Sequence, residues 1–257
     1  MAGRAITGME HPSFLLLILA IGFTGGFIGN IISGTNALIS ISAMILAGMP
    51  PQLAVATHMT GGLGWSLGGL IQFQKAQKIV WKLVWPMAAL AFAGSMIGAN
   101  ILVKADPVLL NQISGFLILL ILPFLFLNKN MGIESFTPAP SRRYFGYGVY
   151  FLIAIWAGFF AAGSGIFVAY VYLGLFGLTI LEYKGTDKIP CFFLCAGAAI
   201  VYIMHGFFDP AYLACSLGGQ FLGATFGAKY AIKLGDRKLR AIMLGAVAFM
   251  GIRLIFR

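Results

Sequence analysis

The stretch IISGTNALIS, residues 31–40, interrupts one of the longest apolar runs of the chain. Four consecutive small or polar residues lie inside it: Ser33, Gly34, Thr35 and Asn36. A lipid-facing helix gains nothing from such residues, because the bilayer interior offers no hydrogen-bond partner to an amide side chain. The stretch therefore predicts a broken membrane segment whose polar residues face other parts of the protein.

The composition places the chain in the membrane class. Of its 257 residues, 60% are hydrophobic and 9% are charged, and the mean hydropathy is +0.94. Soluble domains carry about 25% charged residues. The apolar runs are continuous for about 20 residues or more, which is the length of a helical span, whereas barrel strands alternate apolar and polar residues. We expect an all-α polytopic integral membrane protein, embedded in the lipid bilayer of a cell membrane, most simply a bacterial inner membrane.

The net charge of +10 would suggest nucleic acid in a soluble protein. Here the basic residues gather in short loops between apolar segments, where they orient the chain in the membrane, so no nucleic-acid partner is expected. The two main clusters are Lys75, Lys78 and Lys82, and then Lys229, Lys233, Arg237, Lys238 and Arg240. The three cysteines lie in apolar segments and the chain has only three histidines, so neither a metal site nor a cofactor is expected.

The two halves of the chain match at one offset, 129 residues. Six glycines of the first half coincide with glycines of the second, where chance gives about two. The pairs are Gly29 and Gly158, Gly34 and Gly163, Gly48 and Gly177, Gly68 and Gly197, Gly94 and Gly223, and Gly98 and Gly227. Glycine allows close approach of membrane helices, so the coincidence predicts a shared backbone architecture. We assign residues 1–128 to a first membrane repeat, 129–141 to a polar linker and 142–257 to a second membrane repeat.

Each half reads as a long, interrupted apolar segment followed by three spans, which gives about 8–10 membrane segments. The expected segments are 13–47, 52–73, 80–103 and 108–128, and then 143–181, 188–206, 210–234 and 238–257. Each long segment either crosses once or folds back. Folding back places the basic loops 74–82, 129–143 and 229–240 on one face, as the positive-inside rule favours. Five segments per half then make the repeats inverted, with broken or re-entrant helices, which is a transporter design.

Two stretches at the repeat offset carry a family resemblance. The run GGFIGNIISGTNALISISAMILAGMPPQLAVATHMTGGLGWSLGG, residues 25–69, and the run AGFFAAGSGIFVAYVYLGLFGLTILEYKGTDK, residues 157–188, resemble the two repeats of the TauE/SafE family of sulfite exporters. The resemblance covers the chain from about residue 13. It implies a transporter for small sulfur-containing anions such as sulfite, sulfoacetate and other organosulfonates. Thr35 and Asn36 depart from the family's richer glycine cluster, which leaves the substrate open.

The two breaks are the first candidate anion site. The residues are Ser33, Gly34, Thr35 and Asn36 in the first repeat, and Gly163, Ser164 and Gly165 in the second. A half-helix that starts after a break directs free N–H groups and its positive dipole end at the site, and a sulfonate offers three acceptor oxygens. The alternative is that the glycines only allow close packing while the hydroxyls bond their own backbone.

A second candidate pair lies one helix further on. Thr57 and His58 stand at the offset of Thr186 and Asp187, and Lys188 follows directly. Ionisable groups inside a membrane are functional candidates by default, and Lys188 supplies positive charge for an anion. The alternative places Asp187 and Lys188 at the membrane surface, paired with water or with neighbouring charged residues.

The mechanism expected is secondary or facilitated export by alternating access, in which one repeat rocks against the other. The sequence contains no phosphate-binding loop of the ATPase type, and His58 has no serine or cysteine partner at a readable spacing, so we expect no enzyme. Alternatives are an anion channel, or an importer of another small organic anion. The glycine-rich helix faces also permit a homodimer.

Overall fold

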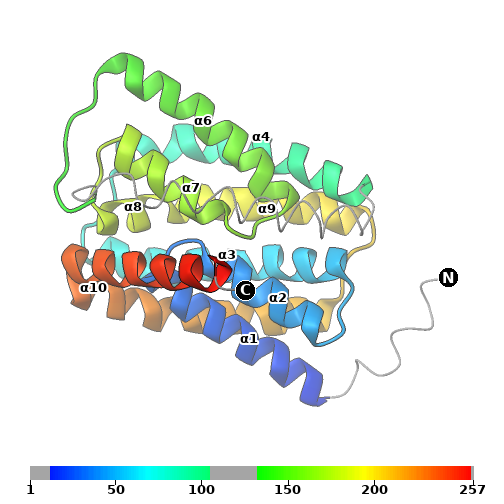
Figure 1. Ribbon diagram of the computed structural model, residues 1–257. Helices are drawn as coiled ribbons and strands as arrows, with labels where there is room; N and C mark the ends of the chain where they lie inside the picture. Colours follow the sequence, from blue (N-terminus) through cyan, green and yellow to red (C-terminus); the bar gives the residue numbers. More distant parts are fainter. Residues whose placement is uncertain (1–11, 105–131, 256–257) are drawn as a thin grey trace.

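The computed structural model describes residues 12–104 and 132–255, and it shows a polytopic helical membrane protein (Figure 1). Helices α1 and α4 are each long and apolar enough to cross a bilayer. The predicted span 108–128 lies outside the described residues. The helices are α1 (Pro12–Ile31), α2 (Thr35–Leu46), α3 (Pro51–Lys75), α4 (Trp81–Lys104), α6 (Pro140–Phe159), α7 (Ser164–Tyr170), the π-helix η2 (Val171–Leu175), α8 (Ile180–Thr186), α9 (Lys188–Met204) and α10 (Pro210–Ile255).

The helix boundaries recur at the offset of 129 residues. Helix α2 corresponds to α7 with η2, α3 corresponds to α8 with α9, and α4 corresponds to the first 24 residues of α10. Gly34 and Gly163 each precede a half-helix with the same positive φ of 81°. The two halves therefore follow one backbone course twice. The division at 1–128, 129–141 and 142–257 stays a prediction, because the end of the first repeat lies outside the described residues.

The long first segment of each repeat folds back on itself. A β-carbon added at Gly29 would meet Asn36, and one added at Gly25 would meet both Asn36 and Ser40, so α2 runs antiparallel to α1. Figure 1 shows the same return from α6 to α7. The segment Ser164–Leu175 then meets Ile180–Thr186 at an angle of 118°. Of the two arrangements left open by the sequence, the folded-back one is present.

The two repeats are inverted. Gly62 of α3 faces Cys195 of α9, and Gly69 faces Lys188, so these equivalent helices cross in opposite directions. As a result, the α3–α4 connection, the start of α6 and the later break in α10 lie at one end of the bundle (Figure 1). The backbone N–H of Leu181 donates to Asp236 Oδ1 over 2.7 Å at that end. The basic loops share one face, as the charge pattern predicts.

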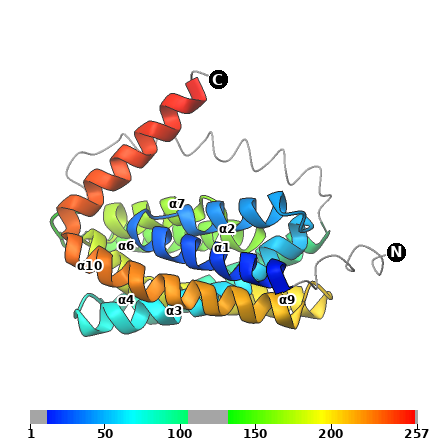
Figure 2. The ribbon, with the colours of Figure 1, turned by 90° about the horizontal axis from the view of Figure 1, so that it is seen from below.

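Helix α10 contains a break at Gly235, whose φ of 75° and ψ of 167° are not helical. Glycine adopts this conformation without the steric cost that a β-carbon would bring. The chain beyond the break turns away from the rest of α10 (Figure 2). The break falls between the predicted spans 210–234 and 238–257, inside the predicted basic loop.

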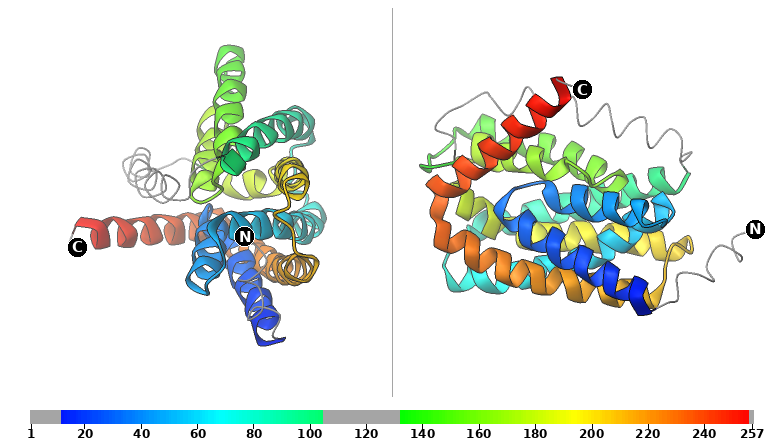
Figure 3. Two further views of the ribbon diagram at one scale, coloured as in Figure 1. Left: turned by 90° about the vertical axis from the view of Figure 1, so that its right-hand side faces the viewer. Right: turned by 60° about the horizontal axis from the view of Figure 1, so that its bottom comes forward.

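Helix α4 and the equivalent first part of α10 each pack with the other repeat. Gly219, Gly223 and Gly227 of α10 lie against the backbone of Leu19, Phe23 and Phe27 of α1, while Gly94 and Gly98 of α4 lie against α6. Helices α1, α2, α3 and α10 form one layer, here called body A, and α4, α6, α7, α8 and α9 form the other, body B (Figure 3, left). The expectation that one repeat rocks against the other therefore needs correction, since the packed bodies are not the sequence halves.

Candidate functional site

The two helix breaks touch each other. A β-carbon added at Gly165 would lie 2.9 Å from Gly34 Cα, and one added at Gly34 would lie 2.6 Å from Ile166 Cγ1. These separations are too short for ordinary carbon contacts. The breaks therefore meet at a point where only glycine fits on both sides, as expected for inverted repeats with broken helices.

A cavity of about 100 Å³ lies beside this contact. One water molecule needs about 10–15 Å³, so the space suits several waters or one small anion. Both breaks contribute to its wall, together with α1, α3, α6, α8 and α9. Eight of the predicted residues line it: Ser33, Gly34, Asn36, His58, Ser164, Gly165, Asp187 and Lys188.

One wall of the cavity is charged. Lys184 and Lys188 lie one helical turn apart, and both are buried, with 4% and 1% of their surface exposed. Lys184 Nζ donates to Ser33 Oγ over 3.0 Å, which connects α8 to the first break. Asp187 lies between the two lysines in sequence, is also buried and lines the same cavity. The alternative that places Asp187 and Lys188 at the membrane surface is wrong, because both are enclosed by protein.

Lys188 is positioned by an aromatic ring and a glycine. Its Nζ lies 3.0 Å from the centroid of the Trp65 ring, a cation–π contact. A β-carbon at Gly69 would meet the Lys188 stem, so the glycine makes room for it. Trp65 is fixed in turn, since its Nε1 donates to the carbonyl of Gly26 over 3.2 Å. Lys188 also lines the cavity, so its ammonium group, which carries three donors, is placed to reach a ligand there.

Asn36 has its partners within the protein. Its Nδ2 donates to Gln220 Oε1 over 3.0 Å, and its Oδ1 accepts from Ser40 Oγ over 3.2 Å. Gln220 Nε2 then donates to the backbone oxygen of His58. This chain of bonds offsets the cost of a buried amide and ties α2 to α10 and α3.

Two polar atoms of cavity-lining residues remain without a hydrogen-bond partner in the described part of the chain. They are His58 Nδ1 and Asn30 Oδ1, on side chains that are 5% and 0% exposed. Buried polar atoms are nearly always bonded, so each exception calls for a ligand, a water molecule or a functional role. The position of His58 also supports a functional role, because it is the repeat equivalent of Asp187.

Four predicted residues do not line the cavity: Thr35, Thr57, Gly163 and Thr186. Thr35 Oγ1 donates to the carbonyl of Ile32 over 2.7 Å. Thr186 Oγ1 accepts from the backbone N–H of Val80 over 2.9 Å, which holds the α3–α4 connection. The hydroxyl of Ser164, although at the cavity, also bonds its own backbone at Ala161. For these threonines and this serine the backbone-bonding alternative is the better description.

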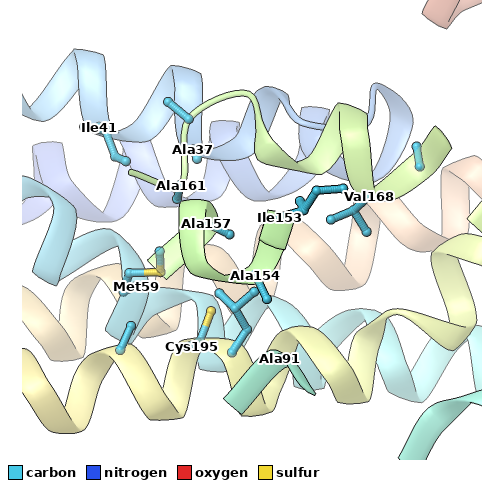
Figure 4. Close-up of a cluster of buried hydrophobic side chains, with 14 of the residues drawn as sticks. Ala37, Ile41, Met59, Ala91, Ile153, Ala154, Ala157, Ala161, Val168 and Cys195 are labelled. Carbon is cyan, nitrogen blue, oxygen red and sulfur yellow. The ribbon is translucent and has the colours of Figure 1, made fainter. Parts of the chain in front are cut away.

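Several cavity residues have no counterpart in the sequence prediction. Lys184, Cys191 and Cys195 are among them, and together with the predicted Lys188 they follow one another at helical spacing along α8 and α9, a stripe that the sequence contains. Tyr150 and Trp65 enter the cavity from distant helices without any local signal. Part of the cavity wall is apolar, with Ala157, Ala161, Met59 and Cys195 close together (Figure 4).

The chain is similar in sequence to known proteins. The profile of the family described as sulfite exporter TauE/SafE matches residues 18–254. The chain belongs to the TauE/SafE family. This confirms the resemblance drawn from the two repeat stretches. Its relatives in this family include probable membrane transporter proteins from Haemophilus influenzae, 26% identical over 94% of both chains, and from Sinorhizobium, 28% identical over 96% of this chain and 95% of the relative.

A third relative of the TauE/SafE family is the probable membrane transporter protein YjnA of Bacillus subtilis, 24% identical over 91% of this chain and 96% of the relative. No solved structure gives a significant match. The TauE/SafE relatives support a membrane transporter, and the cavity at the two breaks is the feature on which a more specific proposal rests.

Proposed function

We propose that this chain exports small sulfur-containing anions, namely sulfite, sulfoacetate or another organosulfonate, across the bacterial inner membrane. The observation that carries the proposal is the convergence of two buried lysines, Lys184 and Lys188, on the cavity beside the helix breaks. Buried charges are costly unless they are paired, and one carboxylate, Asp187, cannot pair with two ammonium groups. A bound anion supplies the missing charge.

The donor set suits an oxyanion. Each ammonium group has three donors; that of Lys188 lies against the Trp65 ring, and Lys184 gives one of its three to Ser33. A sulfonate group has three acceptor oxygens, and charge-assisted hydrogen bonds are about twice as strong as neutral ones. The break residues Ser33, Gly34, Asn36, Ser164 and Gly165 shape the neighbouring wall, and Gly163 sets the backbone turn before Ser164. Thr35, Thr57 and Thr186 hold the surrounding backbone in this proposal.

Export needs no separate energy source in this arrangement. An inside-negative potential favours the exit of an anion by about 2.3 kcal/mol per charge per 100 mV. Access alternates as bodies A and B rock across the contact between α3 and α9, which carries the cavity. The role is transport without covalent chemistry.

An anion channel and an importer are the alternatives. A channel requires polar residues along a continuous lumen, whereas the polar and charged residues described above gather in a single cavity. That concentration favours a carrier. A homodimer stays a prediction, which cross-linking in membranes would test.

The test is efflux of radiolabelled sulfite from liposomes that contain the purified protein. We expect a saturable flux, competition by sulfoacetate and methanesulfonate, and a strong loss in Lys184→Met and Lys188→Met. Lys82→Met is the matched control, because Lys82 is exposed on the basic face. Flux that never saturates, or unchanged flux in both cavity variants, would refute the proposal, and single-channel currents would favour the channel.

A further inference from the structure

The cavity contains more titratable groups than a simple anion site requires. On α3 stands His58, and facing it across the cavity are Lys184 and Tyr183 of α8, Asp187 between α8 and α9, Lys188, Cys191 and Cys195 of α9, and Tyr150 of α6. The described residues of α1 and α2 that line the cavity are neutral, Asn30 and Asn36 among them, and no described residue of α10 lines it. The charge of the occupied cavity therefore depends on these groups and on the ligand.

The arrangement fits one negative ligand charge. Two ammonium groups and one carboxylate sum to one positive charge, which a monoanion neutralises. A dianion leaves one negative charge in a space enclosed by protein and lipid, where an uncompensated charge is expensive. The cavity then needs one further proton whenever its ligand carries one further negative charge.

His58 is the group best placed to take that proton. Its side chain is 5% exposed, it lines the cavity, and its Nδ1 has no hydrogen-bond partner among the described residues. An imidazole accepts a proton at an unpartnered nitrogen without breaking an existing bond, and the protonated ring donates from both nitrogens. The charge balance above counts both lysines as cations, and His58 is the repeat equivalent of Asp187, the one acidic residue among the described residues that line the cavity.

We propose that His58 takes up one proton when the cavity binds a dianion and none when it binds a monoanion, so that the dianion leaves the cell together with a proton. This inference rests on the proposed function of the cavity as an anion site. It has a thermodynamic consequence. Affinity for a dianion relative to a monoanion should fall by about tenfold per pH unit where His58 is neutral in the empty protein, since one proton is linked to binding.

Calorimetry on the full chain in lipid nanodiscs tests this directly. The probes are methanesulfonate and sulfate, a monoanion and a dianion that both stay fully ionised between about pH 5 and 8, the range in which histidine ordinarily titrates. Titrations in buffers of different ionisation enthalpy count the protons taken up on binding. We expect the count for sulfate to exceed that for methanesulfonate by about one, and His58→Gln to abolish the difference.

A second readout needs no substitution in the cavity. In protein labelled with ¹⁵N-histidine, sulfate should convert the His58 ring to imidazolium while methanesulfonate should not. The chain has three histidines, so replacing His11 and His205 leaves His58 as the only signal. Equal proton counts for the two anions would overturn the inference while leaving the anion site intact. A difference that persists in His58→Gln, or disappears only in Asp187→Asn, would overturn the assignment to His58. Binding of neither anion would refute the proposed function, and the inference with it.

Discussion

Replacing Lys188 by Met separates the two contributions that this side chain makes. Methionine keeps the length of the stem that passes Gly69 but removes the ammonium group over Trp65. In the empty protein, this takes one of two positive charges from a cavity that holds one carboxylate. In the occupied protein, it removes one of the two cations that line the cavity. The substitution should therefore stabilise the empty protein and weaken anion binding.

The magnitudes follow from the burial of the side chain, which is 1% exposed. A hydrogen bond to a charged group contributes about 1.5–3 kcal/mol, so losing it should weaken binding of methanesulfonate by about 10- to 150-fold. Removing one partner of a buried ion pair usually destabilises a protein because it leaves an unpaired charge, but here the excess charge is positive, so removing one cation leaves Lys184 paired with Asp187 and should raise stability. Both lysines share one carboxylate, Asp187. After Lys188 is replaced, Lys184 still neutralises it.

The assay measures both quantities on one sample in nanodiscs: the thermal midpoint without ligand, and the Kd for methanesulfonate. Lys82→Met on the exposed basic face is the control and should change neither. A lower midpoint in Lys188→Met with unchanged Kd would refute the reasoning, because it would show that Lys188 is a structural partner of Asp187 rather than an anion ligand.

Three further predictions concern the breaks, the cysteines and the topology. Gly165→Ala should abolish efflux and lower the free energy of unfolding by about 1–3 kcal/mol, because its β-carbon meets Gly34. Gly218→Ala is the control: its helix position has open space, so the free energy of unfolding should rise by up to about 1 kcal/mol. Thermal unfolding and efflux assays check both variants. An anionic thiosulfonate reagent should modify Cys191 and block efflux, and methanesulfonate should slow the modification. Mass spectrometry measures it. A rate that methanesulfonate does not change would contradict the placement of the anion beside Cys191. Cysteines introduced at Lys78 and Lys238 should react with an impermeant reagent from the same side of the membrane, and reaction from opposite sides would contradict the inverted arrangement.

The backbone of this protein could be predicted from glycine and charge. The offset of 129 residues, read from six glycine pairs, recurs in the bounds of the helices and in the matching φ of Gly34 and Gly163. The folded-back segments followed from the basic loops, since each loop has to lie on the positive face. Glycine positions and loop charges can be read from each segment separately, so one sequence was enough to find these features.

The partners of the side chains could not be predicted in the same way. Asn36 was expected to hold the anion, but its amide bonds Gln220, which is 184 residues away. Lys184 was not among the predicted site residues, because the sequence does not show that α8 packs against the first break. Nor does the repeat reveal that α4 and α10 exchange places between the halves. Such contacts depend on long-range packing, which hydrophobic patterns of single segments do not encode.

The cavity lies between the two bodies, which is an arrangement that a carrier needs. Body A provides Ser33 and His58, and body B provides Lys184 and Lys188, so the two bodies supply different halves of the site. In the empty protein the hydrogen bond from Lys184 to Ser33 joins the bodies directly. An anion between them is held from both sides, and its binding energy is greatest in the conformation in which both halves reach it. A ligand shifts a conformational equilibrium only through such a difference in affinity. In the transport cycle proposed above, the anion therefore favours the conformation in which both bodies reach it, and a change in the separation of bodies A and B releases it on one side or the other.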